Sequence, residues 1–152
     1  MKRRKAREGV MRALYQIDLG RCGVEDAFDF AVGESVDLGI AEDVMPFAKR
    51  LLNTTYDNLT QIDLMLSELA KGWTVDRMSP IDRNIMRIAV CEMLFFQEEV
   101  PIATAINEAV EIAKDYGDYE SPKFINGILG KLATSLQRKE SAPGKDGAQE
   151  TS

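Results

Sequence analysis

Histidine is absent from this sequence of 152 residues, and cysteine occurs only twice, at Cys22 and Cys91. Histidine is the commonest general base and the commonest metal ligand in proteins, so its absence removes the residue on which many catalytic and metal sites depend. The two cysteines form no Cys-X-X-Cys pattern and are predicted to be free thiols of a reducing compartment. Catalysis is not excluded on this ground, but its usual residues are missing.

Long apolar runs are also missing. No segment approaches the roughly 20 apolar residues that a transmembrane helix needs, and the charged N-terminus does not resemble a signal peptide. We therefore expect a cytoplasmic protein with no membrane partner. No segment alternates apolar and polar residues as a β-strand does, so the sequence predicts an all-α fold.

Charge is distributed unevenly along the chain. The net charge is −6, but residues 2–12 contain six basic side chains and one acid, Glu8, so that the rest of the chain carries a net charge of −11. A polyanion that approaches such a protein is attracted only to its basic end. The N-terminal segment is therefore a candidate contact for nucleic acid, and the alternative is a solvated helix face.

Residues 80–96 are predicted to form the central helix of the fold. Ser79 is its expected N-cap and Pro80 its first residue, because serine accepts a hydrogen bond from a free backbone N–H and proline has none to satisfy. Apolar residues at helical spacing occupy two sides of this segment. The helix is therefore expected to be packed on both of these sides.

Three charged residues of this segment carry further expectations. Glu92 falls inside the main apolar stripe, where an unpaired carboxylate is costly, so we expect a hydrogen-bonding or cationic partner beside it. Arg83 and Arg87 lie one turn apart on the least apolar side of the helix. Both are expected to face outward.

Apolar spacing and capping signals predict six more helices. Asp43 and Ser121 are the expected N-caps of two of them. Thr60 and Asp63 form an expected capping box, and Gly117 is expected to end its helix in the left-handed conformation. The predicted helices cover residues 3–19, 24–31, 43–59, 60–72, 101–117 and 121–137.

The chain is long enough to fold as one domain without disulfides or metals. We expect this helical domain to cover residues 1–137. Apart from one proline, residues 138–152 contain only two apolar residues, both alanine. They are expected to form a disordered tail.

Three segments of the sequence resemble, in order and spacing, the signature segments of the NusB family of transcription antitermination factors. They are RRKAREGVMRALYQ, DRMSPIDRNIMRIAVCEM and VPIATAINEAVEIAKDYGDYESPKFINGIL. The resemblance implies a seven-helix NusB-like fold, in which two three-helix sub-bundles surround a central helix. It also implies that the chain is not an enzyme and has no catalytic residue, no metal and no cofactor.

Members of this family bind the boxA element of ribosomal RNA leader transcripts together with the ribosomal protein NusE. The pair joins elongating RNA polymerase, which then reads through terminators. The resemblance therefore implies boxA RNA and NusE as direct partners and the RNA polymerase antitermination complex as an indirect one. Family members occur both as monomers and as homodimers, so the sequence leaves a homodimer open.

The family's functional positions match particular residues of this chain. Its arginine-rich N-terminal motif implies phosphate contacts, since a guanidinium group binds a phosphate through two hydrogen bonds. Lys5 departs from this motif, because arginine is usual there. Aromatic residues on an RNA surface stack on unpaired bases. The resemblance assigns Tyr15 and Asp82 to the contact with NusE, and it assigns to RNA Arg3, Arg4, Lys5, Arg7, Arg87, Tyr116, Glu120, Lys123 and Phe124.

Several of these residues have a second interpretation. Tyr116 and Phe124 keep helical spacing and suit the core as well as a base contact. Glu120 either accepts a hydrogen bond from the exocyclic amine of a base or stabilises a helix start by its charge. Tyr15 projects from the polar side of its helix, and Asp82 occupies a helix start that we expect to be accessible, as partner contacts would.

Two other functions compete with antitermination. The first is the RNA-binding module of ribosomal RNA cytosine methyltransferases, which resembles the same family. That module is joined to a cofactor-binding domain with a glycine-rich loop, and this sequence has no such loop. The second is a non-catalytic helical protein-interaction scaffold without RNA affinity, which the retained arginines disfavour.

Overall fold

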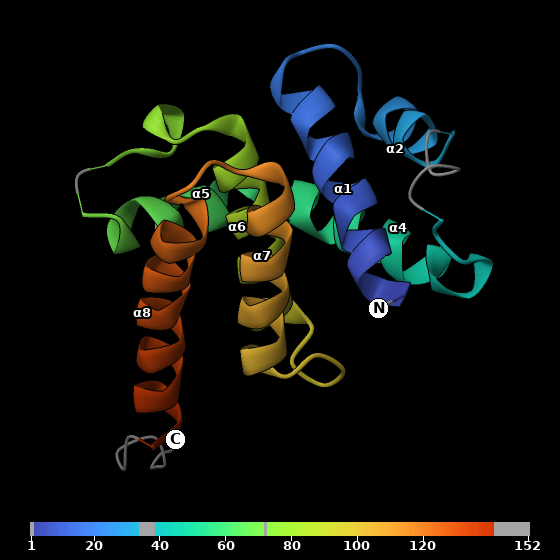
Figure 1. The fold of residues 1–152 in the computed structure, drawn as a ribbon. Coiled ribbons are helices and arrows are strands. Elements are labelled where there is room, and N and C mark those ends of the chain that lie inside the picture. The colour runs from blue at the N-terminus through green and yellow to red at the C-terminus, as the bar shows by residue number, and fades with distance from the viewer. Residues whose placement is uncertain (1, 34–38, 72, 142–152) are drawn as a thin grey trace.

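The computed structural model describes residues 2–33, 39–71 and 73–141, and it confirms the predicted all-α fold. Seven α-helices and no strand occur in this part of the chain (Figure 1). None of these helices is long and apolar enough to cross a membrane. The helices are α1 (Lys2–Asp18), α2 (Val24–Gly33), α4 (Met45–Asp57), α5 (Leu59–Leu69), α6 (Pro80–Phe95), α7 (Ile102–Tyr116) and α8 (Ser121–Ser141), with short 3₁₀ helices η1 (Glu42–Val44) and η2 (Val75–Arg77).

Helix α6 is the central helix, as the sequence predicts. Eleven of its sixteen residues are buried, and it packs against α1, α4, α5, α7 and α8. Helices α1, α2 and α4 pack against one another on one side of α6, and α5, α7 and α8 lie on the other (Figure 1). This arrangement is the predicted pair of three-helix sub-bundles around a central helix.

The predicted start of α6 is confirmed, because the backbone N–H of Asp82 donates to Ser79 Oγ at 3.1 Å and Pro80 is the first helical residue. The other predicted N-caps are wrong. Asp43 lies inside η1, and its carboxylate accepts a hydrogen bond from Lys2 Nζ at 3.0 Å instead of capping α4. Thr60 does not cap α5, because this helix begins at Leu59 and Thr60 lies inside its first turn, and Asp63 pairs with Arg87.

The prediction of a left-handed Gly117 is also wrong. Its φ and ψ angles are −91° and −173°, which is an extended conformation open to any residue. The site requires glycine for a different reason: a Cβ atom there would lie 2.5 Å from both Cβ and Oγ of Ser121. Ser121 is also not the predicted N-cap of α8, because it is the first residue of that helix. It forms a reciprocal pair with Asp118, in which Asp118 Oδ1 accepts from the Ser121 N–H and Ser121 Oγ accepts from the Asp118 N–H.

The last helix is longer than predicted. Helix α8 ends at Ser141, so residues 138–141 are helical, although the sequence predicts the start of a disordered tail there. The rest of the predicted tail, residues 142–152, lies outside the described part of the chain.

Candidate functional site

The basic residues at the start of α1 are mostly engaged by groups of the same chain. Arg4 forms a two-pronged ion pair with Glu108 on α7, in which Nε and Nη2 each lie 2.9 Å from a carboxylate oxygen. These hydrogen bonds hold the pKa of Glu108 below its usual value. Arg3 places its guanidinium carbon 4.1 Å from the centroid of the Phe47 ring. Both arginines keep part of their side chains at the surface.

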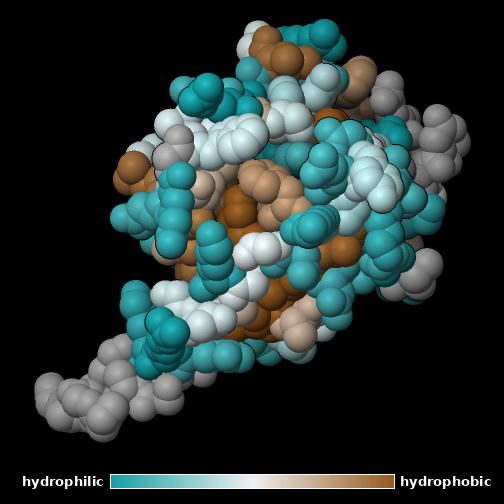
Figure 2. Space-filling model, turned by 60° about the vertical axis from the view of Figure 1, so that its left-hand side comes forward, coloured by the Kyte–Doolittle hydropathy of each residue, from teal (hydrophilic) through white to brown (hydrophobic). Residues whose placement is uncertain are grey.

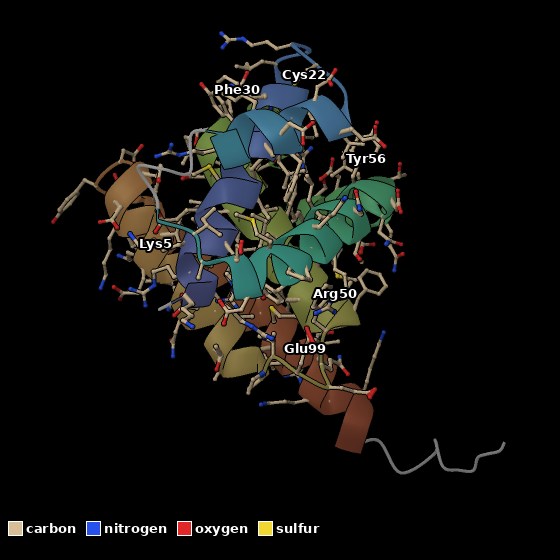
Figure 3. All side chains as sticks on the ribbon, turned by 90° about the vertical axis from the view of Figure 1, so that its right-hand side faces the viewer. Lys5, Cys22, Phe30, Arg50, Tyr56 and Glu99 are labelled. Carbon is tan, nitrogen blue, oxygen red and sulfur yellow. The ribbon has the colours of Figure 1, made fainter. Side chains whose placement is uncertain are left out.

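Lys5 is the most accessible of the predicted basic contacts on α1. Its side chain is exposed (Figure 3) and, among the described residues, makes no ion pair. Arg4 faces α7 through Glu108, whereas Arg3 faces Phe47 on α4. A phosphate group therefore has access to Lys5 directly and to Arg4 by sharing it with Glu108.

Arg7 does not share this exposure, although the resemblance assigns it to RNA. Only 4% of its side chain is accessible, and its guanidinium group meets Glu92, which is 1% accessible. Arg7 Nε lies 3.0 and 2.9 Å from the two carboxylate oxygens, and Nη2 lies 2.8 Å from Oε2. The prediction that Glu92 has a cationic partner is confirmed, and this partner is Arg7. The Arg7 side chain therefore lies in the core.

Arg87 is likewise buried, and the prediction that it faces outward is wrong. Its guanidinium group donates to both oxygens of Asp63 on α5, at 2.8 and 2.7 Å, and to Asp18 at the end of α1, at 3.0 Å. Arg83 reaches the other oxygen of Asp18 at 2.7 Å, so it too faces a neighbouring helix. Burial alone would raise the pKa of Asp18, but the hydrogen bonds from Arg83 and Arg87 outweigh it and lower that pKa.

Tyr116 ends α7 and is fixed from both sides by α1. Arg12 Nη2 donates to the Tyr116 hydroxyl at 3.0 Å, and that hydroxyl donates to Glu8 Oε1 at 3.0 Å. The Arg12 guanidinium carbon also lies 5.6 Å from the ring centroid. Burial and the nearby Glu8 raise the pKa of Tyr116. Tyr116 is therefore neutral and half-buried, with Arg12 as a basic neighbour that the resemblance does not assign to RNA.

The remaining predicted RNA contacts lie at the start of α8. Glu120 and Lys123 are exposed, and Phe124 is half-buried at the side of a shallow groove. Trp73, from the connection before η2, packs against Phe124 with the ring centroids 6.0 Å apart. Figure 2 turns the side of α5 and α8 forward and shows apolar side chains at the surface among hydrophilic ones. Sequence reasoning missed Trp73 because its segment has no helical periodicity.

The two residues predicted to meet NusE differ in accessibility. Tyr15 is partly exposed on α1, whereas Asp82 is 8% exposed, so the expectation of an accessible Asp82 is wrong. Burial raises the pKa of Asp82, although hydrogen bonds with Ser121 and Ser79 oppose the rise. Its Oδ1 atom is buried without a hydrogen-bond partner in the described residues. Leaving such an atom without a donor costs free energy.

The described residues show no group of three or more acidic or cysteine side chains that could hold a metal ion. Cys22 and Cys91 are free, as predicted. Burial raises the pKa of Cys91 to about 12, so this thiol stays protonated at neutral pH. The arrangement of exposed cations, aromatic rings and a partly satisfied carboxylate suits the binding of a partner.

The chain is similar to proteins of one family in both sequence and structure. A model described as the NusB family matches residues 4–134. The transcription antitermination protein NusB of Heliobacterium modesticaldum is 43% identical over 150 residues, which make up 97% of this chain and 71% of that protein.

Solved structures give the same result. The structure of T. maritima NusB has a TM-score of 0.79 and 34% identity, covering 91% of this chain and 96% of that one. A crystal structure of antitermination factors NusB and NusE in complex with dsRNA has a TM-score of 0.77 and 27% identity, covering 88% of this chain and 97% of that one.

Proposed function

The chain belongs to the NusB family of transcription antitermination proteins, and we propose that it binds boxA RNA of ribosomal RNA leader transcripts jointly with the ribosomal protein NusE. The RNA and the two proteins then act on elongating RNA polymerase in the cytoplasm, so that the polymerase reads through terminators. The match of the family model to residues 4–134 carries this proposal, because it includes every candidate contact except Arg3. Antitermination factors of this family are non-catalytic, which confirms the expectation that the chain is not an enzyme.

The similarity to a NusB protein crystallised with NusE and RNA supports the two partners. On this chain we assign the RNA contacts to two groups of residues. The first group contributes charge from the start of α1, where Lys5 is exposed and Arg4 is accessible beside Glu108. The second group lies where α7 ends and α8 begins. The proposed direct contacts are Arg3, Arg4, Lys5, Tyr116, Glu120, Lys123 and Phe124.

Arg7 and Arg87 act on this surface indirectly. Each is bound to carboxylates inside the fold, and each joins α6 to a neighbouring helix. We assign them a positioning role: Arg7 fixes α1 against α6 through Glu92, and Arg87 fixes the end of α1 and the start of α5. The phosphate-binding residues of α1 are thereby held in place relative to Tyr116.

Binding of NusE is proposed at Tyr15 and Asp82. The Tyr15 ring supplies partly exposed aromatic surface on α1, and Asp82 supplies a buried carboxylate oxygen without a partner in the described residues. Because that oxygen is buried, a donor from NusE reaches it only if the residues that cover it move on binding, and such a donor would then remove the cost of leaving it unsatisfied. The change Tyr15→Asp is expected to weaken NusE binding and to leave the affinity for RNA alone within about twofold, because Tyr15 belongs to neither group of RNA contacts. Equal NusE affinity of this variant and the parent in a calorimetric titration would contradict the assignment.

The proposal is tested by anisotropy titration of a labelled boxA RNA, with a scrambled RNA of the same length as reference, in the presence and absence of NusE. We expect NusE to tighten binding to boxA but not to the scrambled RNA. A protein that binds both RNAs equally, with no effect of NusE, would leave only a helical interaction module.

The charge at the start of α1 is tested by the salt dependence of the same titration. Changing Arg3, Arg4 and Lys5 together to glutamine should reduce the slope of log Kd against log salt by about 0.7 for each phosphate of single-stranded RNA that these side chains neutralise. Lys49→Gln, an exposed cation on α4, is the matched control and should keep the parent slope. An unchanged slope in the triple variant would refute these phosphate contacts.

A further inference from the structure

The groove beside Phe124 extends beyond this one aromatic residue. It lies between the end of α5 and the outer face of α8, and its lining residues are Ala70, Glu120, Lys123, Phe124, Gly127, Ile128 and Lys131. Its volume of about 380 Å³ is at the lower end of ligand pockets, which hold about 300–1,000 Å³. This size suits one nucleotide and is too small for a base-paired helix.

The floor of the groove is apolar and aromatic. Phe124 and Ile128 supply its apolar side, and Gly127 leaves it open, because a Cβ atom at that position would meet no atom within 4 Å. Trp73 extends the aromatic surface at the edge next to Phe124, and 52% of its surface is exposed. An exposed tryptophan packed on a second ring at 51° presents a broad face to which an unpaired base can stack.

The rim of the groove is charged, with more positive than negative groups. Lys123 and Lys131 lie on the same side of α8 as the groove, and Glu120 stands at its start. Lys131 Nζ is held by the Leu69 carbonyl oxygen at 3.3 Å, which keeps the ammonium group beside the groove and leaves it further protons to donate. In a chain with a net charge of −6, such a local excess of cations is complementary to a phosphate backbone.

We propose that this groove binds one unpaired nucleotide of the RNA, with the base against Phe124 and Trp73 and the flanking phosphates at Lys123 and Lys131. The Glu120 carboxylate accepts a hydrogen bond from the exocyclic amine of that base, which favours adenine, cytosine or guanine over uracil. The inference rests on the proposed function. It adds to it Trp73, Gly127 and Lys131, which the family resemblance does not assign to RNA. The groove continues the proposed interface, because Lys123 and Phe124 belong to both.

Trp73 is the only tryptophan of the chain, so its fluorescence reports on the groove directly. We expect RNA that carries the boxA sequence to quench this fluorescence with the same midpoint that anisotropy gives. Trp73→Ala should weaken binding about fivefold or more, since a stacked base contributes at least about 1 kcal/mol. Trp73→Phe should recover most of that affinity. Tyr56→Ala, which removes an exposed aromatic side chain from α4 (Figure 3), is the control and should bind RNA as the parent does.

A second pair of variants compares a side chain added inside the groove with the same side chain added outside it. Gly127→Leu places a side chain in the groove, and Gly130→Leu places the same side chain on α8 outside it, where a Cβ atom also meets nothing within 4 Å. Neither change should lower the melting temperature, because glycine is unfavourable inside a helix. We expect Gly127→Leu to weaken RNA binding about fivefold or more, as the removal of one stacked base requires, and Gly130→Leu to change it less than twofold.

Other outcomes of this experiment separate the inference from the proposed function. If the parent binds RNA with NusE-dependent selectivity but Trp73 is not quenched and Gly127→Leu binds normally, the groove is not an RNA site and the proposed function stands. If Gly127→Leu weakens NusE binding instead of RNA binding, the groove is a protein contact and the inference is wrong. If the parent binds no RNA in either titration, both are overturned.

Discussion

Removing the Arg7 guanidinium group should destabilise the fold strongly, and it should not remove a direct contact with RNA. The group lies 2.8–3.0 Å from the carboxylate oxygens of Glu92, and both side chains are at most 4% accessible. Arg7→Ala leaves the Glu92 carboxylate buried with no equivalent donor, and removing one partner of a buried ion pair costs about 3–5 kcal/mol. We expect the free energy of unfolding, measured by urea denaturation with far-UV circular dichroism at pH 7, to fall by about that amount.

An apolar replacement of the whole pair separates stability from RNA binding. Arg7→Met combined with Glu92→Leu removes both buried charges and conserves most of the side-chain volume, a change that is often neutral or stabilising in buried ion pairs. This double variant should have an unfolding free energy within about 1 kcal/mol of the parent value, and it should bind boxA RNA with the parent affinity. Lys5→Ala is the reverse control: it should weaken RNA binding but leave the unfolding free energy nearly unchanged, since an exposed side chain contributes little to stability.

The reasoning would be refuted by a double variant that is folded and stable but has a reduced RNA affinity or a weaker salt dependence. That result would mean that the Arg7 side chain leaves Glu92 to reach a phosphate. It would also mean that the resemblance, which assigns Arg7 to RNA, describes this residue better than its burial does.

Two further predictions concern stability. Hydrogen bonds from Arg83 and Arg87 lower the pKa of Asp18 below 3.8, so its ionised form stabilises the fold above that pH, and this stabilisation disappears as the pH falls through the folded-state pKa. Asp18→Asn should therefore reduce the acid dependence of the unfolding free energy below about pH 4. An unchanged pH profile would contradict the lowered pKa. Gly117→Ala places a Cβ atom 2.5 Å from Ser121, and a change that overpacks a tight contact typically destabilises by about 1–3 kcal/mol; urea denaturation should show this decrease, and equal midpoints for the variant and the parent would refute the steric argument.

The sequence was sufficient to predict the central helix because its signals are local. Ser79 and Pro80 mark its start within two residues, and apolar spacing on two sides indicates burial on both. The need of Glu92 for a partner was also visible, since an unpaired carboxylate in an apolar stripe is costly wherever the partner comes from. What the spacing could not supply was the identity of that partner, which lies 85 residues away.

The error at Arg87 has the same physical origin. A helical wheel identifies the least apolar side of a helix, but that side faces solvent only if no neighbouring helix supplies charges of the opposite sign. Here Asp18 and Asp63 approach from α1 and α5, so the least apolar side of α6 is an internal polar contact. The wrong conformation predicted for Gly117 arises similarly, since a C-cap signal cannot show that a serine four residues later occupies the space of a Cβ atom.

These internal ion pairs determine how an acidic chain can bind a polyanion. Of the basic residues that open α1, Arg7 is fully engaged by Glu92 and Arg4 is shared with Glu108, so the charge that an approaching RNA meets is smaller than the sequence suggests. A phosphate that takes a hydrogen bond from Arg4 must compete with a carboxylate already in place, and the net gain is therefore reduced. Stacking of a base on Phe124 displaces no internal ion pair, because this ring packs against the Trp73 ring and not against a charged group. We therefore expect the RNA affinity of this chain alone to depend on salt less than its number of basic residues suggests. The affinity needed for function then comes from base stacking and from a protein partner that adds its own contacts.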